Sequence, residues 1–139
     1  MAIYDHFTSA ELACPCGQCG QGEANMDPTF MYIMVSMRKE LGFAFPVTSG
    51  FRCFAYNDSL YVALGFAPET HLHGPHTTGH AIDMNLYDGR LYAYMELAFR
   101  RGMTGFGQKQ HGPRRKRFVH TDNLPRAMGQ PRPHMWTYS

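Results

Sequence analysis

The sequence has little net charge and no long hydrophobic run. The 139-residue chain carries a formal charge of +2, and none of its apolar runs approaches the ~18–20 residues that a membrane-spanning helix needs. Its first residues, MAIYDHFTSAEL, lack the charged and apolar regions of a Sec signal peptide. We therefore expect a protein that is made in the cytoplasm and does not insert into a membrane. If it acts outside the cell, another route must deliver it.

The chain also lacks repeats, low-complexity segments and linkers, and 44% of its residues are hydrophobic. This predicts a single globular domain over residues 1–139. The charge is uneven, because residues 114–117 form the basic run RRKR. That run is either a solvated loop or a docking patch for an anionic polymer such as the cell wall. No nucleic-acid-binding motif accompanies it, so we do not expect nucleic acid as a partner.

Cysteine is scarce and clustered. Cys14, Cys16 and Cys19 lie in the irregular segment 1–25, and Cys53 follows much later. In a protein made in the cytoplasm, clustered cysteines favour a metal site over disulfides. Three alternatives remain open: a four-cysteine structural zinc site, a disulfide between Cys53 and one of the first three, or free thiols.

Periodicity predicts an alternation of helices and short strands. A helix over 28–41 has Asp27 as its N-cap, Pro28 at its first position and Gly42 at its end. Further helices are predicted over 53–65 and 88–102, strands over 45–50, 81–86, 103–107 and 117–122, and an irregular tail over 124–139. No regular βαβ rhythm is present. We expect an α+β fold with a central, mainly antiparallel sheet flanked by helices.

The stretch GPHTTGHAIDMN, residues 74–85, is the chemically richest part of the chain. Asp83 lies on the predicted strand among apolar alternates, and His76 precedes it by seven residues across the Gly79 turn. His120 lies in RFVHTD, also strand-like, with Asp122 on the same strand face. Two histidines and one carboxylate leave a fourth metal position open, which is the composition of a catalytic zinc site.

These residues belong to a wider pattern. His76, Gly79, Ala81 and Asp83 reproduce H-x-x-G-x-A-x-D, the motif of the zinc D-alanyl-D-alanine carboxypeptidases and related peptidoglycan peptidases. VTSGFRC is similar to the strand and turn TSGYR of that family, FVHTD to its third-ligand strand, and HFTSAELAC to the N-terminus of its small phage and bacterial members. The resemblance runs in order over residues 6–126.

The resemblance implies a fold shared with the lysostaphin-type peptidases and the hedgehog signalling domain. It implies that His76, Asp83 and His120 bind one catalytic zinc ion. It also implies that Arg52, in SGFR, faces the substrate and steadies its carboxylate or the developing oxyanion, for which the paired donors of arginine are suited.

The sequence departs from the family pattern at several positions. Gly74 stands where a serine is usual, His71 and His73 lie in an apparent insertion, and His80 stands where arginine is frequent. The most consequential departure is Arg117, which occupies the place of the glutamate that serves many members as general base. We expect Arg117 to face solvent, and it cannot accept a proton.

Another residue must then supply the base. Asp122 is the leading candidate, with support of a ligand histidine as its alternative role, and His80 and His111 are weaker candidates.

The resemblance favours a zinc metallopeptidase that hydrolyses an amide bond in peptidoglycan stem peptides or cross-links, as a D-Ala-D-Ala carboxypeptidase or an endopeptidase. The missing Sec signal fits a phage lysis enzyme, or a wall-opening enzyme carried in the virion beside other virion proteins. Such an enzyme would act at the cell wall or in the periplasm. The alternative from another class is a catalytically inactive zinc-binding module, structural or wall-binding, in a virion.

Overall fold

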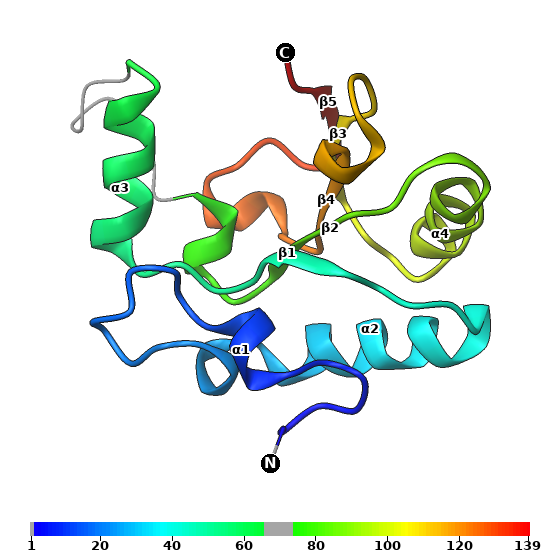
Figure 1. The fold of residues 1–139 in the computed structure, drawn as a ribbon, viewed down its shortest axis with the longest axis horizontal. Helices are drawn as coiled ribbons and strands as arrows, with labels where there is room; N and C mark the ends of the chain where they lie inside the picture. Colours follow the sequence, from blue (N-terminus) through cyan, green and yellow to red (C-terminus); the bar gives the residue numbers. More distant parts are fainter. Residues whose placement is uncertain (1, 66–73) are drawn as a thin grey trace.

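A computed structural model describes residues 2–65 and 74–139, and Figure 1 shows its architecture. The helices and strands are α1 (Ser9–Leu12), α2 (Pro28–Leu41), β1 (Val47–Ser49), α3 (Phe54–Ala63), β2 (Ala81–Met84), α4 (Asp88–Arg100), β3 (Gly105–Lys109), β4 (Phe118–Asp122) and β5 (His134–Thr137). Short 3₁₀ turns occupy Glu23–Asn25, Pro75–Thr77, Arg114–Lys116 and Arg126–Met128.

The strands form one sheet in the order β1-β2-β4-β3-β5. Every neighbouring pair is antiparallel except β3 and β5, which run parallel. In the β2–β4 pair Asp83 lies opposite His120, and Ala81 lies opposite Asp122. The predicted α+β class with a mainly antiparallel sheet is thus confirmed, and the sheet register aligns two of the candidate ligands.

The two faces of the sheet have different roles. Ile82, Met84, Val119 and Phe106 alternate onto a face that is closed by α2 and α4, and their side chains are fully or almost fully buried. A hydrogen bond crosses this core, from the Tyr94 hydroxyl of α4 to Thr121 Oγ1 of β4 at 2.8 Å. Figure 1 shows α4 on one side of the sheet and α3 on the other. Asp83 and His120 therefore point to the α3 side.

Helix α2 forms for the reasons that its sequence predicts. The Asp27 carboxylate accepts the Phe30 N–H at 2.9 Å, Pro28 occupies the first turn, and Gly42 ends the helix with a φ of 74°. Helices α3 and α4 and strands β1 to β4 also lie within or across the predicted ranges.

Both chain ends, which the sequence predicted to be irregular, contain regular secondary structure. Thr8 and Glu11 cap the short helix α1 reciprocally, Thr8 accepting the Glu11 N–H at 3.1 Å and Glu11 accepting the Thr8 N–H at 2.9 Å. The tail from residue 124 does not only wrap the surface, because His134–Thr137 pairs with β3 as β5. Prolines at 131 and 133 hide this strand from a sequence analysis, since they break the local pattern. Among the described residues, no helix is long and apolar enough to cross a membrane.

Candidate active site

Three elements bring the candidate ligands together. Asp83 and His120 are cross-strand neighbours on β2 and β4. His76 belongs to the 3₁₀ turn that precedes β2, and the chain reverses at Gly79, whose φ is 79°. A side chain at Gly79 would clash with the backbone of Asn25, because this turn packs against the start of α2. The glycine of the motif thus permits the reversal that returns His76 to the strand.

The ligand atoms converge on one point. His76 Nε2 lies 3.1 Å from Asp83 Oδ1, His120 Nδ1 lies 2.9 Å from the same oxygen, and the two nitrogens are 3.2 Å apart. All three residues are buried. For comparison, a tetrahedral site with metal–ligand distances of ~2.0–2.1 Å separates its ligand atoms by roughly 3.4 Å. The triangle therefore has the size of one face of a zinc coordination shell.

Hydrogen bonds fix which nitrogen of each ring faces the triangle. His76 Nδ1 lies 2.8 Å from the Gly50 carbonyl oxygen, which can only accept, so this nitrogen carries the proton. His120 Nε2 lies 2.7 Å from Asp122 Oδ2 and donates to that carboxylate. In both neutral rings the other nitrogen then presents a lone pair to Asp83 Oδ1. Three lone pairs that meet in a buried place suit a cation, so the donor set fits zinc.

Charge at the site is shaped by burial and by close partners. Burial alone would raise the pKa of Asp83, but His76 and His120 outweigh it and hold that pKa well below its ordinary value. Burial lowers the pKa of His76. Burial would also lower the pKa of His120, but its hydrogen bonds to Asp122 and Asp83 raise it. The site therefore keeps an ionised carboxylate between two buried imidazoles, and this arrangement favours the binding of a cation.

Asp122 lies behind His120 and is completely buried. Arg132 clamps it with two hydrogen bonds, Nε to Oδ1 at 2.8 Å and Nη2 to Oδ2 at 2.7 Å. The Leu124 N–H adds a third donor at 3.3 Å, and His120 is the fourth. Burial would raise the pKa of Asp122, but His120 and Arg132 lower it to about 2. Four donors match the four lone-pair sites of a carboxylate, so no free acceptor position remains.

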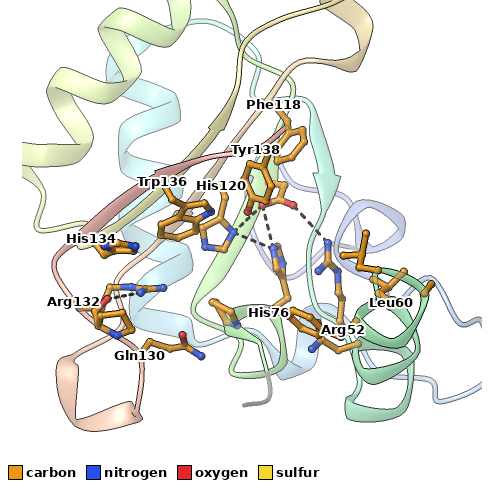
Figure 2. Close-up of a pocket in the computed structure, with 17 residues that line it drawn as sticks. Arg52, Leu60, His76, Phe118, His120, Gln130, Arg132, His134, Trp136 and Tyr138 are labelled. Carbon is orange, nitrogen blue, oxygen red and sulfur yellow. Dashed lines mark hydrogen bonds and ion pairs between the residues drawn. The ribbon is translucent and has the colours of Figure 1, made fainter. Parts of the chain in front are cut away.

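The ligand triangle opens into a cavity of about 560 Å³ (Figure 2). Arg52 lines it, with Nε donating to Ser49 Oγ at 3.0 Å and Nη2 lying 3.6 Å from Asp83 Oδ2. Leu60 of α3 and Leu64, the residue after α3, form part of the apolar wall, and Phe118 of β4 forms another part. An apolar cavity with a few convergent polar groups at its base is the usual form of a small-ligand site.

The opposite wall comes from the chain end, which the sequence analysis left without a function. Arg132, His134, Trp136 and Tyr138 all line the cavity, and their spacing of two is that of one strand face. The Trp136 ring centroid lies 5.1 Å from that of His120. The alternation in RPHMWTY was the available signal, and the flanking prolines obscured it.

Two glycines on β3 make room for this wall. A Cβ at Gly107 would clash with the Trp136 indole, and one at Gly105 would clash with the Asp122 carboxylate and Arg132. Both glycines are cross-strand partners of β5 residues, Gly107 of Trp136 itself. The two glycines of GFG in β3 therefore leave the space that the side chains of Trp136, Asp122 and Arg132 occupy.

The remaining candidates lie outside the cavity wall. His80 Nδ1 contacts Asn123 Oδ1 at 2.9 Å, and His111 Nε2 lies 3.4 Å from the Tyr138 carbonyl oxygen. Neither is among the residues that line the cavity. His71 and His73 lie outside the described residues.

The basic run is only partly solvated. Arg114 and Arg117 both approach Asp88, at 3.0 and 3.7 Å. The side chain of Arg117 is 24% exposed rather than fully open to solvent, and it donates to the Gly112 carbonyl at 3.0 Å. It does not line the cavity, so its charge is directed away from the ligand triangle.

The cysteines form a second group that the structure brings together. The four sulfurs of Cys14, Cys16, Cys19 and Cys53 all lie within 4.8 Å of one another. All four are free thiols in the structure. Cys53 is the residue after Arg52, so this group lies next to the Arg52 side of the cavity.

The sheet-borne His–Asp–His set and the cavity above it define a metallohydrolase of the zinc-peptidase class. Comparison with known families agrees: residues 5–122 match the family model Peptidase M15. The chain belongs to the Peptidase M15 family and is a zinc-dependent peptidase of the D-Ala-D-Ala carboxypeptidase type. No curated protein and no solved structure matches the chain. The family match ends at Asp122, before the chain end that carries Arg132 and Trp136.

Proposed function

We propose that the protein hydrolyses an amide bond in peptidoglycan stem peptides or cross-links, at a D-Ala-D-Ala or similar bond. The observation that carries the proposal is the convergence of three lone pairs, from His76, Asp83 and His120, at the base of an open cavity. Membership of the Peptidase M15 family supports it. We further propose that it acts as a phage lysis enzyme, or as a virion-associated enzyme that works at the cell wall or in the periplasm.

His76, Asp83 and His120 would hold the zinc ion, which when bound supplies Lewis-acid polarisation of the scissile carbonyl. The residues around them orient these ligands. The Gly50 carbonyl fixes the ring of His76, and Asp122 fixes that of His120. Both contacts hold the ligand set in place before any metal binds.

Arg52 is the proposed binder of the substrate carboxylate or of the developing oxyanion. Its guanidinium lies at the cavity wall beside Asp83, tied to Ser49 at 3.0 Å, and its side chain is 22% exposed. A tethered guanidinium that remains accessible can donate two parallel hydrogen bonds to an incoming carboxylate. The C-terminal carboxylate of a stem peptide has the required chemistry.

We assign Asp122 to support of His120 rather than to proton transfer. It is completely buried, and all its acceptor positions are occupied. On the described part of the cavity wall, Asp83 is the sole carboxylate, and it is a ligand. His134 of β5 is the wall imidazole outside the ligand set, and imidazole is the commonest general base. His134 thus replaces His80 and His111 as the next residue to test.

The test is digestion of purified peptidoglycan and defined stem peptides by the zinc-loaded protein, read by mass spectrometry. Release of free D-alanine would identify a carboxypeptidase, and conversion of cross-linked dimers to monomers an endopeptidase. His134→Ala is compared with His111→Ala, a matched change outside the cavity.

Failure to cut any wall peptide would favour the alternative, a catalytically inactive zinc-binding module. The observation that supports this alternative is that Arg117 stands in the place of the family glutamate.

A further inference from the structure

The four cysteines form a cluster whose spacing suits a metal rather than a disulfide. The sulfurs lie within 4.8 Å of one another, and Cys53 Sγ lies 4.0 Å from Cys16 Sγ. Zinc–sulfur bonds of ~2.3 Å in a tetrahedron separate the sulfurs by roughly 3.8 Å, whereas a disulfide joins them at ~2.05 Å. The cluster therefore has the dimensions of a tetrathiolate site.

Every sulfur in the cluster accepts a backbone N–H. The four bonds are Cys53 N–H to Cys14 Sγ at 3.3 Å, Gln18 N–H to Cys16 Sγ at 3.4 Å, Gln21 N–H to Cys19 Sγ at 3.3 Å and Tyr56 N–H to Cys53 Sγ at 3.4 Å. Backbone N–H groups aimed at sulfur stabilise the thiolate, which is the form that binds metal. Four thiolates this close repel one another unless a cation lies between them.

Two of these bonds come from a repeated turn. The sequence CGQCGQ, residues 16–21, holds Cys-Gly-Gln twice, and both glycines have a φ of 69°. In each copy the glycine turns the chain so that the glutamine N–H points back at the cysteine sulfur. A left-handed backbone is accessible mainly to glycine. The repeat thus presents two sulfurs through local backbone geometry.

We propose that Cys14, Cys16, Cys19 and Cys53 bind one zinc ion, separate from the catalytic metal. Four thiolates are soft ligands that favour zinc over magnesium, calcium or manganese. A closed set of four protein ligands leaves no position for water, so the site is structural. This proposal goes beyond the proposed peptidase activity and does not depend on that activity.

The position of the cluster indicates what the zinc holds in place. It joins the N-terminal segment to the turn that carries Gly50 and Arg52. The two segments are already in contact, because Phe51 N–H donates to the Leu12 carbonyl at 3.1 Å. A side chain at Gly50 would meet the Leu12 backbone at 2.7 Å. The zinc would therefore fix the carbonyl that orients His76 and the arginine that faces the substrate.

The first test is the metal content of the purified full chain. Native mass spectrometry is expected to show two zinc ions in the wild type and one in the double variant Cys16→Ser/Cys19→Ser. The matched control is His76→Ala, which removes a ligand from the other site. This variant is also expected to hold one zinc ion. That ion should remain bound when a thiol reagent is added under native conditions.

The second test identifies the ligands and separates the two sites. Cobalt(II) replaces zinc, and a tetrathiolate site gives a sulfur-to-cobalt charge-transfer absorption in the near ultraviolet. We expect this band in the wild type and in His76→Ala, and its loss in the double cysteine variant. The proposal is tested by the presence of the band in the wild type and in His76→Ala. Misfolding of the cysteine variant therefore cannot decide the result.

Three outcomes would overturn the proposal. They are a single zinc ion in the wild type with four thiols that react freely in the folded protein, a disulfide in the protein isolated under reducing conditions, and iron in place of zinc. A wild type that holds zinc at its cysteines but cuts no wall peptide would refute the proposed function and leave this site intact.

Discussion

The two ligand groups of this protein are built in opposite ways. His76, Asp83 and His120 lie on a sheet and a turn and are buried, with exposed fractions of 3%, 7% and 2%. The cysteines lie on loops and at a helix start, and they range from the buried Cys14 to the exposed Cys19. The first group is held by the sheet and the core, whereas two sulfurs of the second group, those of Cys16 and Cys19, are held by local backbone turns.

The difference extends to what orients each ligand. The His76 ring is fixed by Gly50, far away along the chain, and the His120 ring by Asp122, which Arg132 of the chain end holds in turn. The sulfurs of residues 16 and 19 are fixed by N–H groups two residues further on. We therefore expect the His–Asp–His set to be preorganised without metal, and the cysteine set to depend more on its proposed metal for its order.

Removal of a catalytic ligand is expected to have the largest effect on activity and little effect on the fold. His120→Ala takes one of three protein ligands from zinc, so hydrolysis of wall peptides should fall to background. Circular dichroism should stay near that of the wild type, because β4 remains paired on both sides. Retention of substantial activity would show that the metal is held elsewhere.

Arg132→Ala tests whether the chain end supports the preorganised site. The change leaves Asp122 buried without its charged partner, and breaking a buried pair in this way costs about 3–5 kcal/mol. The measurement is the free energy of unfolding in urea. Arg126→Ala, an exposed arginine of the same tail, is the matched control and should change it by less than about 0.5 kcal/mol. Equal effects of the two changes on the free energy of unfolding would show that Arg132 does not support the site.

Asp122→Asn distinguishes support of His120 from proton transfer. An amide replaces one acceptor oxygen with a donor, so Arg132 loses one of its two hydrogen bonds in either orientation, and His120 loses its partner when the amide nitrogen replaces Oδ2. Loss of such outer support typically costs 10–100-fold in metal affinity or activity. Competition with a chelator measures the zinc affinity alongside kcat. A variant that binds zinc as tightly as the wild type but has lost kcat would return Asp122 to the role of base.

Zinc removal should affect the two regions unequally. After chelation under reducing conditions, amide exchange at residues 13–22 and 50–56 is expected to rise about tenfold or more, which corresponds to about 1.4 kcal/mol. Exchange at 81–84 and 118–122 should change little, because those strands pair within the sheet. The readout is hydrogen exchange followed by mass spectrometry. Uniform loss of protection would mean that the two regions unfold together.

The sequence sufficed for the parts of the fold that local chemistry decides. Helix α2 has its cap, its proline and its terminal glycine within a single stretch, so its bounds follow directly. The pairing of Asp83 with His120 was expected from the family resemblance, while alternation alone gave each residue its strand face. Cys53 joined the other cysteines although it lies far along the chain, because the turn after β1 packs on Leu12.

The features that the sequence did not reveal depend on long-range contacts. Strand β5 forms because β3 offers a free edge, and prolines at 131 and 133 directly precede it. Arg132 is buried where it pairs with the Asp122 carboxylate, and Gly105 leaves the space for it. The full occupation of Asp122, which argues against its use as a base, likewise depends on Arg132, which supplies two of the four donors; His120 and Leu124 supply the others.

The smallest predicted effect isolates the backbone of the cysteine turn. At both Gly17 and Gly89 an added Cβ meets no atom within 4 Å, but only Gly17 has a positive φ. Gly17→Ala therefore adds a left-handed strain of about 1–2 kcal/mol, whereas Gly89→Ala, in helix α4, should be neutral or stabilise by about 0.5–1 kcal/mol. Urea unfolding measures both, and cobalt affinity at the cysteines should weaken in Gly17→Ala alone. If the two variants behave alike, the turn does not need its glycine, and the sulfurs are oriented by something other than the repeated Cys-Gly-Gln backbone.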